Sequence, residues 1–153
     1  MAELPRPIDV LPHRDPFLLV SEVTELVAGE RCRGLWRLTG DEAFWAGHFP
    51  GRPTLPGVLM VESLAQVGAI ALLTDQRFAG KLPLFGGIDK ARFRRQVVPG
   101  ETLELEVTLG RMSSVAGKGT GIATVNGEKA CQVDLLFVLA PNGPGVSSLP
   151  TGR

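Results

Sequence analysis

Hydrophobic and polar residues alternate along much of the chain, and this pattern predicts β-strands. The clearest example is residues 102–109, where leucines and a valine occupy one face while glutamates and a threonine occupy the other. The Asn126-Gly127 pair is typical of a tight hairpin turn between two strands. We expect mostly antiparallel strands at residues 17–27, 31–38, 84–97, 102–109, 119–125 and 129–139.

One long apolar segment, residues 54–74, departs from this alternation and predicts a helix that runs to about Arg77. Its single charge, Glu62, would be costly in lipid, so we expect a helix buried inside the protein rather than in a membrane. A helix that is apolar on all sides must be covered on all sides. We therefore expect an α+β fold, with a curved antiparallel sheet of about six strands around this helix and a partner subunit over the remainder.

The composition fits a soluble globular protein, with 44% hydrophobic and 21% charged residues among 153. We expect one domain over residues 1–140 and a disordered tail over residues 141–153. The 16 basic and 16 acidic residues balance, so no overall field attracts nucleic acid or a membrane surface. The first residues lack an apolar leader segment, which predicts a cytoplasmic protein.

The two cysteines, Cys32 and Cys131, lie far apart in apolar segments. We expect both to be reduced thiols in the core. Neither has a histidine or a second cysteine at the spacing of a metal ligand, so we expect no metal site.

A loop dense in proline and glycine carries the candidate chemistry. Residues 47–57 contain three prolines and three glycines among eleven residues, which restricts the loop that holds His48. Glu62 follows on the second turn of the helix, where apolar neighbours disfavour a charged carboxylate. Together they form a candidate base and acid.

Pro56 suits the first helical position, so the amides of Gly57 and Val58 are expected to be free at the positive end of the helix. Such donors can polarise a carbonyl oxygen. The set is suited to proton abstraction next to a carbonyl, followed by loss of a β-leaving group.

The run GHFPGRPTLPGVLMVESLAQVGAIAL at residues 47–72 resembles the signature of (3R)-hydroxyacyl-(acyl carrier protein) dehydratases of the FabZ type. The similarity continues upstream in LPHRDPFLLV and downstream in GIDKARFRRQVVPGETLELEV. It covers approximately residues 8 to 139. The resemblance implies a hot-dog fold, a homodimer whose two sheets join, and commonly a trimer of dimers.

The resemblance also implies the roles of the site residues. His48 of one subunit would face Glu62 of the other. His48 would take the proton from C2, and Glu62 would help the 3-hydroxyl leave as water. The Gly57 amide would polarise the thioester carbonyl. The substrate would arrive on acyl carrier protein and leave as the trans-2-enoyl thioester of fatty-acid or related acyl-chain synthesis, with no metal and no dissociable cofactor.

Two features refine this expectation. Glutamate at position 62, where dehydratase-isomerases tend to have aspartate, favours a simple dehydratase. The family usually has tyrosine where Asp15 stands, and this chain contains no tyrosine. The tyrosine that gates the acyl tunnel in some members is therefore missing. Phe85 or Phe93 would have to replace it, and the acyl-length preference stays open.

Several further residues allow two interpretations each. Phe49 either lines the acyl tunnel or packs in the core. Gln66, one turn after Glu62, either supports that carboxyl group or makes ordinary interior hydrogen bonds. His13 with Arg14 is expected to have a structural or interface role. A cluster of basic residues either docks the acidic carrier protein or forms a solvated face with subunit salt bridges; it comprises Lys90, Arg92, Arg94 and Arg95.

Two other functions compete with dehydration. A hot-dog thioesterase would hydrolyse the acyl thioester, but such enzymes generally lack the histidine of the GHFPG loop. A non-catalytic acyl-binding subunit of a heteromeric dehydratase would be expected to have lost His48 or Glu62, and this chain has both.

Overall fold

The computed structural model describes residues 3–141, which form one antiparallel sheet and one long helix. The sheet has six strands in the order β1-β2-β4-β5-β6-β3. Their bounds are β1 (Glu22–Val27), β2 (Arg31–Arg37), β3 (Lys81–Phe93), β4 (Thr102–Met112), β5 (Ala116–Val125) and β6 (Glu128–Pro141). The helical segments are α1 (Pro7–Val10), η1 (Trp45–Gly47), α2 (Gly57–Leu73) and η2 (Gln76–Phe78).

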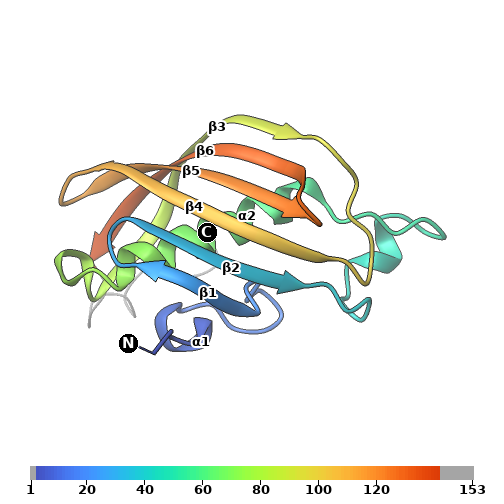
Figure 1. Cartoon of the computed structure of the whole chain (residues 1–153), viewed down its shortest axis with the longest axis horizontal. Helices are drawn as coiled ribbons and strands as arrows, with labels where there is room; N and C mark the ends of the chain where they lie inside the picture. The colour runs from blue at the N-terminus through green and yellow to red at the C-terminus, as the bar shows by residue number, and fades with distance from the viewer. Residues whose placement is uncertain (1–2, 142–153) are drawn as a thin grey trace.

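Helix α2 lies against one face of the sheet, which curves over it (Figure 1). It contacts β2, β3, β4, β5 and β6, and its residues from Val67 to Leu72 are all buried. Small residues allow the close approach: a Cβ on Gly68 would lie 2.6 Å from the ring of Phe137. The predicted α+β architecture is therefore confirmed. Among the described residues, no helix has both the length and the apolar character that crossing a membrane requires.

The predicted end of the long helix is wrong. Helix α2 ends at Leu73, and Arg77 belongs to the separate short helix η2. The hydroxyl of Thr74 donates to the carbonyl of Ile70 at 2.7 Å, and the carboxylate of Asp75 accepts from the amide of Arg77 at 2.9 Å. Such local side-chain bonds compete with a continuing helix.

The strand predictions are correct in number and pairing but differ at several ends. Residues 17–21 precede β1 rather than forming part of it, and residues 94–97 leave β3 to lie near the start of α2, where the Leu55 amide donates to Val97. The β5–β6 turn at Asn126-Gly127 is confirmed, with positive φ at both residues. Strand β6 includes Pro141, which the sequence predicts as the first residue of the tail; the rest of that segment, residues 142–153, lies outside the described part of the chain.

Glu42 organises the loop between β2 and the His48 segment. Its carboxylate accepts from the amides of Thr39 and Gly40 at 3.1 and 3.0 Å and from the indole of Trp45 at 2.8 Å. Partial burial acts to raise the pKa of Glu42, but these hydrogen bonds outweigh it and lower the pKa from 4.5 to about 2. Because Trp45 is buried and begins η1, the bonds fix the approach to His48.

Replacing Gly68 by alanine is expected to destabilise the protein. The added methyl group meets the buried ring of Phe137, and overpacking of this kind costs about 1–3 kcal/mol. Alanine gains about 1 kcal/mol of helix propensity, so the net loss is up to about 2 kcal/mol in urea unfolding at fixed protein concentration. Gly110→Ala is the control, because its nearest contact would be 3.6 Å away. Equal stability of the two variants would contradict close helix–sheet packing at Gly68.

Replacing Glu42 by glutamine is expected to make stability less dependent on acid pH. The folded-state pKa lies below the usual value, so Glu42 stabilises the fold above about pH 4.5 and loses that contribution as the pH falls towards about 2. Discounted for solvent screening, the difference at neutral pH is about 1–2 kcal/mol. Urea unfolding of both proteins from pH 7 to pH 2.5 measures it. A constant difference across this range would rule out the proposed ionic contribution.

Candidate functional site

His48 is held with one ring nitrogen ready to accept a proton. Its Nδ1 lies 2.6 Å from the carbonyl oxygen of Thr54. A carbonyl only accepts hydrogen bonds, so this contact requires the hydrogen on Nδ1 and leaves Nε2 as the basic atom. The ring of Phe49 stacks on the imidazole, with 4.1 Å between centroids. The predicted base therefore has the tautomer and the support that proton abstraction requires.

The start of α2 lies in the same cavity as His48. This cavity, about 520 Å³, is lined by His48, Thr54, Leu55, Gly57, Val58, Met60, Phe93, Arg94, Arg95 and Gln96. Gly57 and Val58 are the first two helical residues, whose amides have no partner within a helix. Pro56 immediately precedes the helix instead of being its first residue. The ring of Phe93 packs on Gly57, where a Cβ would approach it to 2.8 Å.

Glu62 lies in a different cavity. Its side chain is 16% exposed and borders a space of about 180 Å³ with His13, Gln66, Phe85 and Phe137 among the lining residues. The amide nitrogen of Gln66 donates to Glu62 Oε2 at 2.9 Å, and Gln66 also bonds to the backbone of Leu19 and Phe17, so both interpretations of Gln66 apply. No residue lines both this cavity and that of His48. Within one chain, the structure joins His48 to the helix start but not to Glu62.

The two phenylalanines considered as replacements for a gating tyrosine lie in different places. Phe85 pairs with Phe137 on the helix-facing side of the sheet and lines the Glu62 cavity. Phe93 lines the His48 cavity. Both are about half exposed, as is Phe49, so Phe49 is not a core residue of the single chain.

The four basic residues do not form one face. A bulge in the pairing of β3 with β6, between Asp89 and Arg92, separates Lys90 from the other three. Arg94 is exposed and lines the His48 cavity. Arg95 also lines it, but its guanidinium pairs with Glu101 at 3.0 Å and Glu128 at 3.3 Å, which is a structural role.

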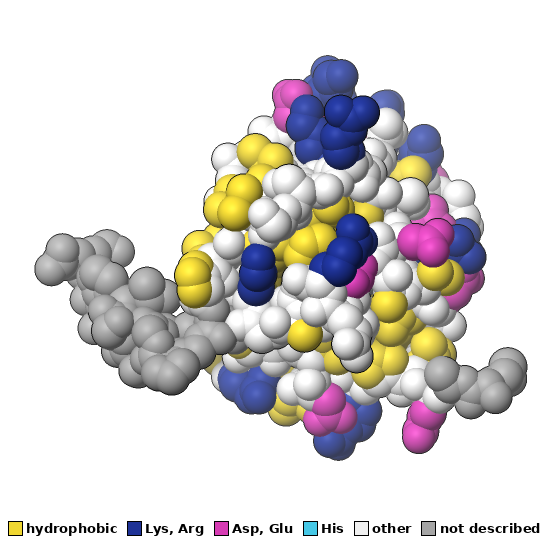
Figure 2. Space-filling model, turned by 90° about the vertical axis from the view of Figure 1, so that its left-hand side faces the viewer, with side chains coloured by type: hydrophobic (Ala, Val, Ile, Leu, Met, Phe, Trp, Pro, Cys, Tyr) yellow, Lys and Arg dark blue, Asp and Glu magenta, His cyan; other side chains and the backbone are white. Residues whose placement is uncertain are grey.

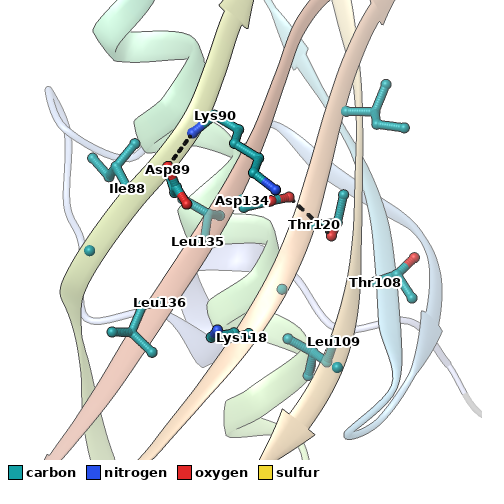
Figure 3. Close-up of a pocket in the computed structure, with 14 residues that line it drawn as sticks. Ile88, Asp89, Lys90, Thr108, Leu109, Lys118, Thr120, Asp134, Leu135 and Leu136 are labelled. Carbon is teal, nitrogen blue, oxygen red and sulfur yellow. Dashed lines mark hydrogen bonds between the residues drawn. The ribbon is translucent and has the colours of Figure 1, made fainter.

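Lys90 lies instead beside a hollow on the outer face of the sheet (Figure 3). This hollow has a volume of about 710 Å³, and its polar lining residues include Asp89, Lys90, Lys118, Thr120 and Asp134. It contains neither His48 nor Glu62. The end of the molecule seen in Figure 2 shows apolar patches between mixed basic and acidic side chains and no histidine. The candidate base and acid lie instead in the two smaller cavities beside α2.

Sequence reasoning missed the position of His13. Its Nε2 lies 3.5 Å from Glu62 Oε2, and both side chains are largely buried. Nothing in the spacing of positions 13 and 62 indicates this contact, because a long loop and two strands separate them.

Both cysteines are free and buried, as predicted. Burial raises the pKa of Cys32 to about 12, with a smaller contribution from Glu25, and raises that of Cys131 to about 11. Each is therefore a protonated thiol at neutral pH and a poor nucleophile. Among residues 3–141, no three His, Cys, Asp or Glu side chains gather as metal ligands.

Comparison of sequences identifies relatives over most of the chain. The FabA-like domain profile matches residues 11–134. A protein of Oenococcus oeni described as 3-hydroxyacyl-(acyl carrier protein) dehydratase FabZ is 58% identical over 130 residues, which are 85% of this chain and 94% of that protein. The protein of the same description from Clostridium novyi is 52% identical over 131 residues, or 86% of this chain and 92% of the relative.

Solved structures agree on the fold. A dehydratase heterocomplex, ApeI:P from Xenorhabdus doucetiae, superposes with a TM-score of 0.79 at 18% identity and covers 96% of this chain and 98% of its own. Cj0977, a virulence protein of Campylobacter jejuni, gives 0.67 at 13% identity, with 90% of each chain covered. These identities are too low to indicate function and show a shared hot-dog fold. With this fold and the sequence matches together, the chain belongs to the FabZ-type family of 3-hydroxyacyl-(acyl carrier protein) dehydratases.

Proposed function

We propose that this protein removes water from (3R)-3-hydroxyacyl thioesters on acyl carrier protein, which gives trans-2-enoyl thioesters for fatty-acid synthesis. The observation that carries the proposal is His48, fixed by Thr54 with its basic Nε2 free, at the amino-terminal end of α2. The 58% identity of this chain with a dehydratase of this substrate class supports the same reaction here.

Each candidate residue has its own part in the proposed reaction. His48 Nε2 takes a proton from C2 while the Gly57 amide, aided by Val58, stabilises the negative charge on the thioester oxygen. The bond from C3 to its hydroxyl oxygen breaks as Glu62 donates a proton to that oxygen. Water leaves, a C2=C3 double bond forms, and the proton on His48 returns to Glu62 through the released water. Only proton transfers are needed, so we propose neither a metal nor a dissociable cofactor.

Two subunits would complete one site. His48 and Glu62 line separate cavities in one chain, so the reaction needs a second copy to bring them together. Strand β3 is an edge of the sheet and exposes Leu84, Phe85, Ile88 and Phe93. An edge with unpaired backbone groups and apolar side chains favours pairing with an identical strand. We propose a homodimer joined along β3, assembled further as a trimer of dimers.

Three aromatic residues would then border the acyl path. Phe49, Phe85 and Phe93 are about half exposed in the single chain and lie beside His48 or Glu62. Burial of these rings by substrate and by the second subunit would recover their apolar surface from water. Phe85 and Phe93 take the place of the missing gating tyrosine in this proposal.

Arg94 is the basic residue best placed to receive the carrier protein. It is exposed and lines the His48 cavity, so it can meet the phosphate of the phosphopantetheine arm or an acidic side chain. Arg92 is exposed nearby in the chain. The paired guanidinium of Arg95 and the outer position of Lys90 make both less suited to this role. A cytoplasmic location stays a prediction.

Loss of either candidate catalytic side chain is expected to stop dehydration. His48→Ala and Glu62→Gln should each lower kcat by about 10²–10⁴-fold, because each removes one proton-transfer group. Ultraviolet absorbance of the enoyl thioester measures the rate. Release of free carrier thiol by the unchanged protein, without enoyl product, would instead indicate a thioesterase.

A mixture of the two inactive variants is expected to regain activity. If His48 and Glu62 meet across subunits, a mixed dimer contains one intact site and one with both changes. Refolding the variants together at equal amounts should then give about a quarter of the normal rate per subunit, because half of the dimers are mixed. No recovery, with mixed dimers verified by two affinity tags, would contradict the shared site.

Reversal of charge at Arg94 is expected to weaken the use of carrier-borne substrate selectively. Arg94→Glu should raise the ratio of KM for the carrier-borne thioester to KM for a short N-acetylcysteamine thioester by about tenfold, since a lost charge-assisted contact costs about 1.4 kcal/mol. Arg111→Glu is a control, because Arg111 is exposed on β4 and lines neither site cavity. An equal ratio in both variants would exclude docking at Arg94.

A further inference from the structure

One oxygen of Glu62 has two polar neighbours. Glu62 Oε2 accepts from Gln66 Nε2 at 2.9 Å and lies 3.5 Å from His13 Nε2. Among the described residues, no hydrogen bond or ion pair involves Oε1 of the same carboxyl group. The two oxygens of the proposed acid therefore have different surroundings.

The contact with Gln66 has a defined direction. Gln66 is 1% exposed, its Oε1 accepts from the amide of Leu19 at 2.8 Å, and its Nε2 also donates to the carbonyl of Phe17 at 2.9 Å. These bonds distinguish the amide oxygen of Gln66 from its nitrogen. The nitrogen donates one hydrogen to the Phe17 carbonyl and the other to Glu62. Glu62 Oε2 is consequently an acceptor, and a proton on this carboxyl group is directed to Oε1.

The loop between α1 and β1 brings His13 to the same oxygen. Leu11 is buried, and Arg14 Nη1 donates to the carbonyls of Leu11 at 2.9 Å and His13 at 2.6 Å. Gln66 holds the loop again at Phe17 and Leu19. The backbone on both sides of His13 is thus fixed to its surroundings, which limits where the imidazole can lie.

The environment of the His13 ring determines which nitrogen carries the hydrogen. Its Nδ1 is buried and has no hydrogen-bond partner within residues 3–141, whereas its Nε2 faces Glu62. A hydrogen on Nε2 can be shared with an acceptor, and one on Nδ1 cannot. At 3.5 Å the contact is longer than a hydrogen bond, and catalytic contacts often tighten when substrate binds.

We propose that His13 is a positioning residue for the acid: with Gln66 it holds Glu62 Oε2 as an acceptor, so that Oε1 carries the proton and delivers it to the departing hydroxyl. This inference rests on the proposed dehydration and adds a residue to it. His13 acts through Glu62 and does not touch the reacting atoms.

Three substitutions test whether the Nε2 donor matters. Glutamine places its amide nitrogen near the position of His Nε2, asparagine resembles the ring only as far as Nδ1, and leucine has no donor. His13→Leu and His13→Asn are expected to lower kcat for dehydration about tenfold or more, a part of the 10²–10⁴-fold effect of a general acid, with KM within about twofold. His13→Gln should restore most of kcat. Thermal unfolding of each variant records any change in stability.

A double substitution separates positioning from a general structural effect. In a Glu62→Asp background the shorter carboxyl group withdraws from His13, so adding His13→Leu should lower kcat by no more than about twofold further. The tenfold effect seen with Glu62 intact would disappear, which is the coupling expected of a residue that acts through another.

Several outcomes would overturn the inference. These are an unchanged kcat in His13→Leu, an equal loss in His13→Gln and His13→Leu, or a further tenfold loss in the Glu62→Asp background. If His48→Ala and Glu62→Gln are inactive while His13→Leu is normal, only the role of His13 fails. If the unchanged protein forms no enoyl product, the proposed function is wrong, and the inference about His13, which depends on it, is wrong as well.

Discussion

Burial of α2 is the constraint on which the rest of the structure depends. The helix has apolar residues on every side, so no orientation allows one face to remain in water without loss of hydrophobic free energy. The curved sheet covers most of the helix, and the small residues Gly68 and Gly121 let helix and sheet approach closely. Every other element is positioned by this contact.

The same helix also carries candidate catalytic groups. Its start presents the amides of Gly57 and Val58 beside His48, and its second turn presents Glu62 among buried neighbours. A rigid, fully packed helix fixes these groups more precisely than a loop can. The loops then adapt to it: Glu42 fixes the segment before His48, and Gln66 fixes the segment that contains His13. The core and the site are therefore one structural unit.

The sheet leaves part of the apolar surface of this chain uncovered. Val58 is 72% exposed at the helix start, and the apolar residues of the edge strand β3 lie in the open. Within one chain His48 and Glu62 line separate cavities, because His48 lies in the loop beside the start of α2 and Glu62 projects from the second turn of the helix. A second copy at this surface would satisfy both the hydrophobic and the catalytic requirement.

The sequence by itself determined the elements and pointed to the candidate reacting groups. Alternation and turn residues specify six strands and one apolar helix because side-chain period is a local property. The GHFPG loop and Glu62 identify the candidate base and acid. The end of the helix at Leu73 is also a local effect, because the side chains of Thr74 and Asp75 bond to neighbouring backbone groups. Tertiary structure decided which groups meet, and a bulge separates Lys90 from Arg92. It alone brings His13 to Glu62, because contacts between distant segments depend on how the helix and loops pack and leave no periodic signal in the chain.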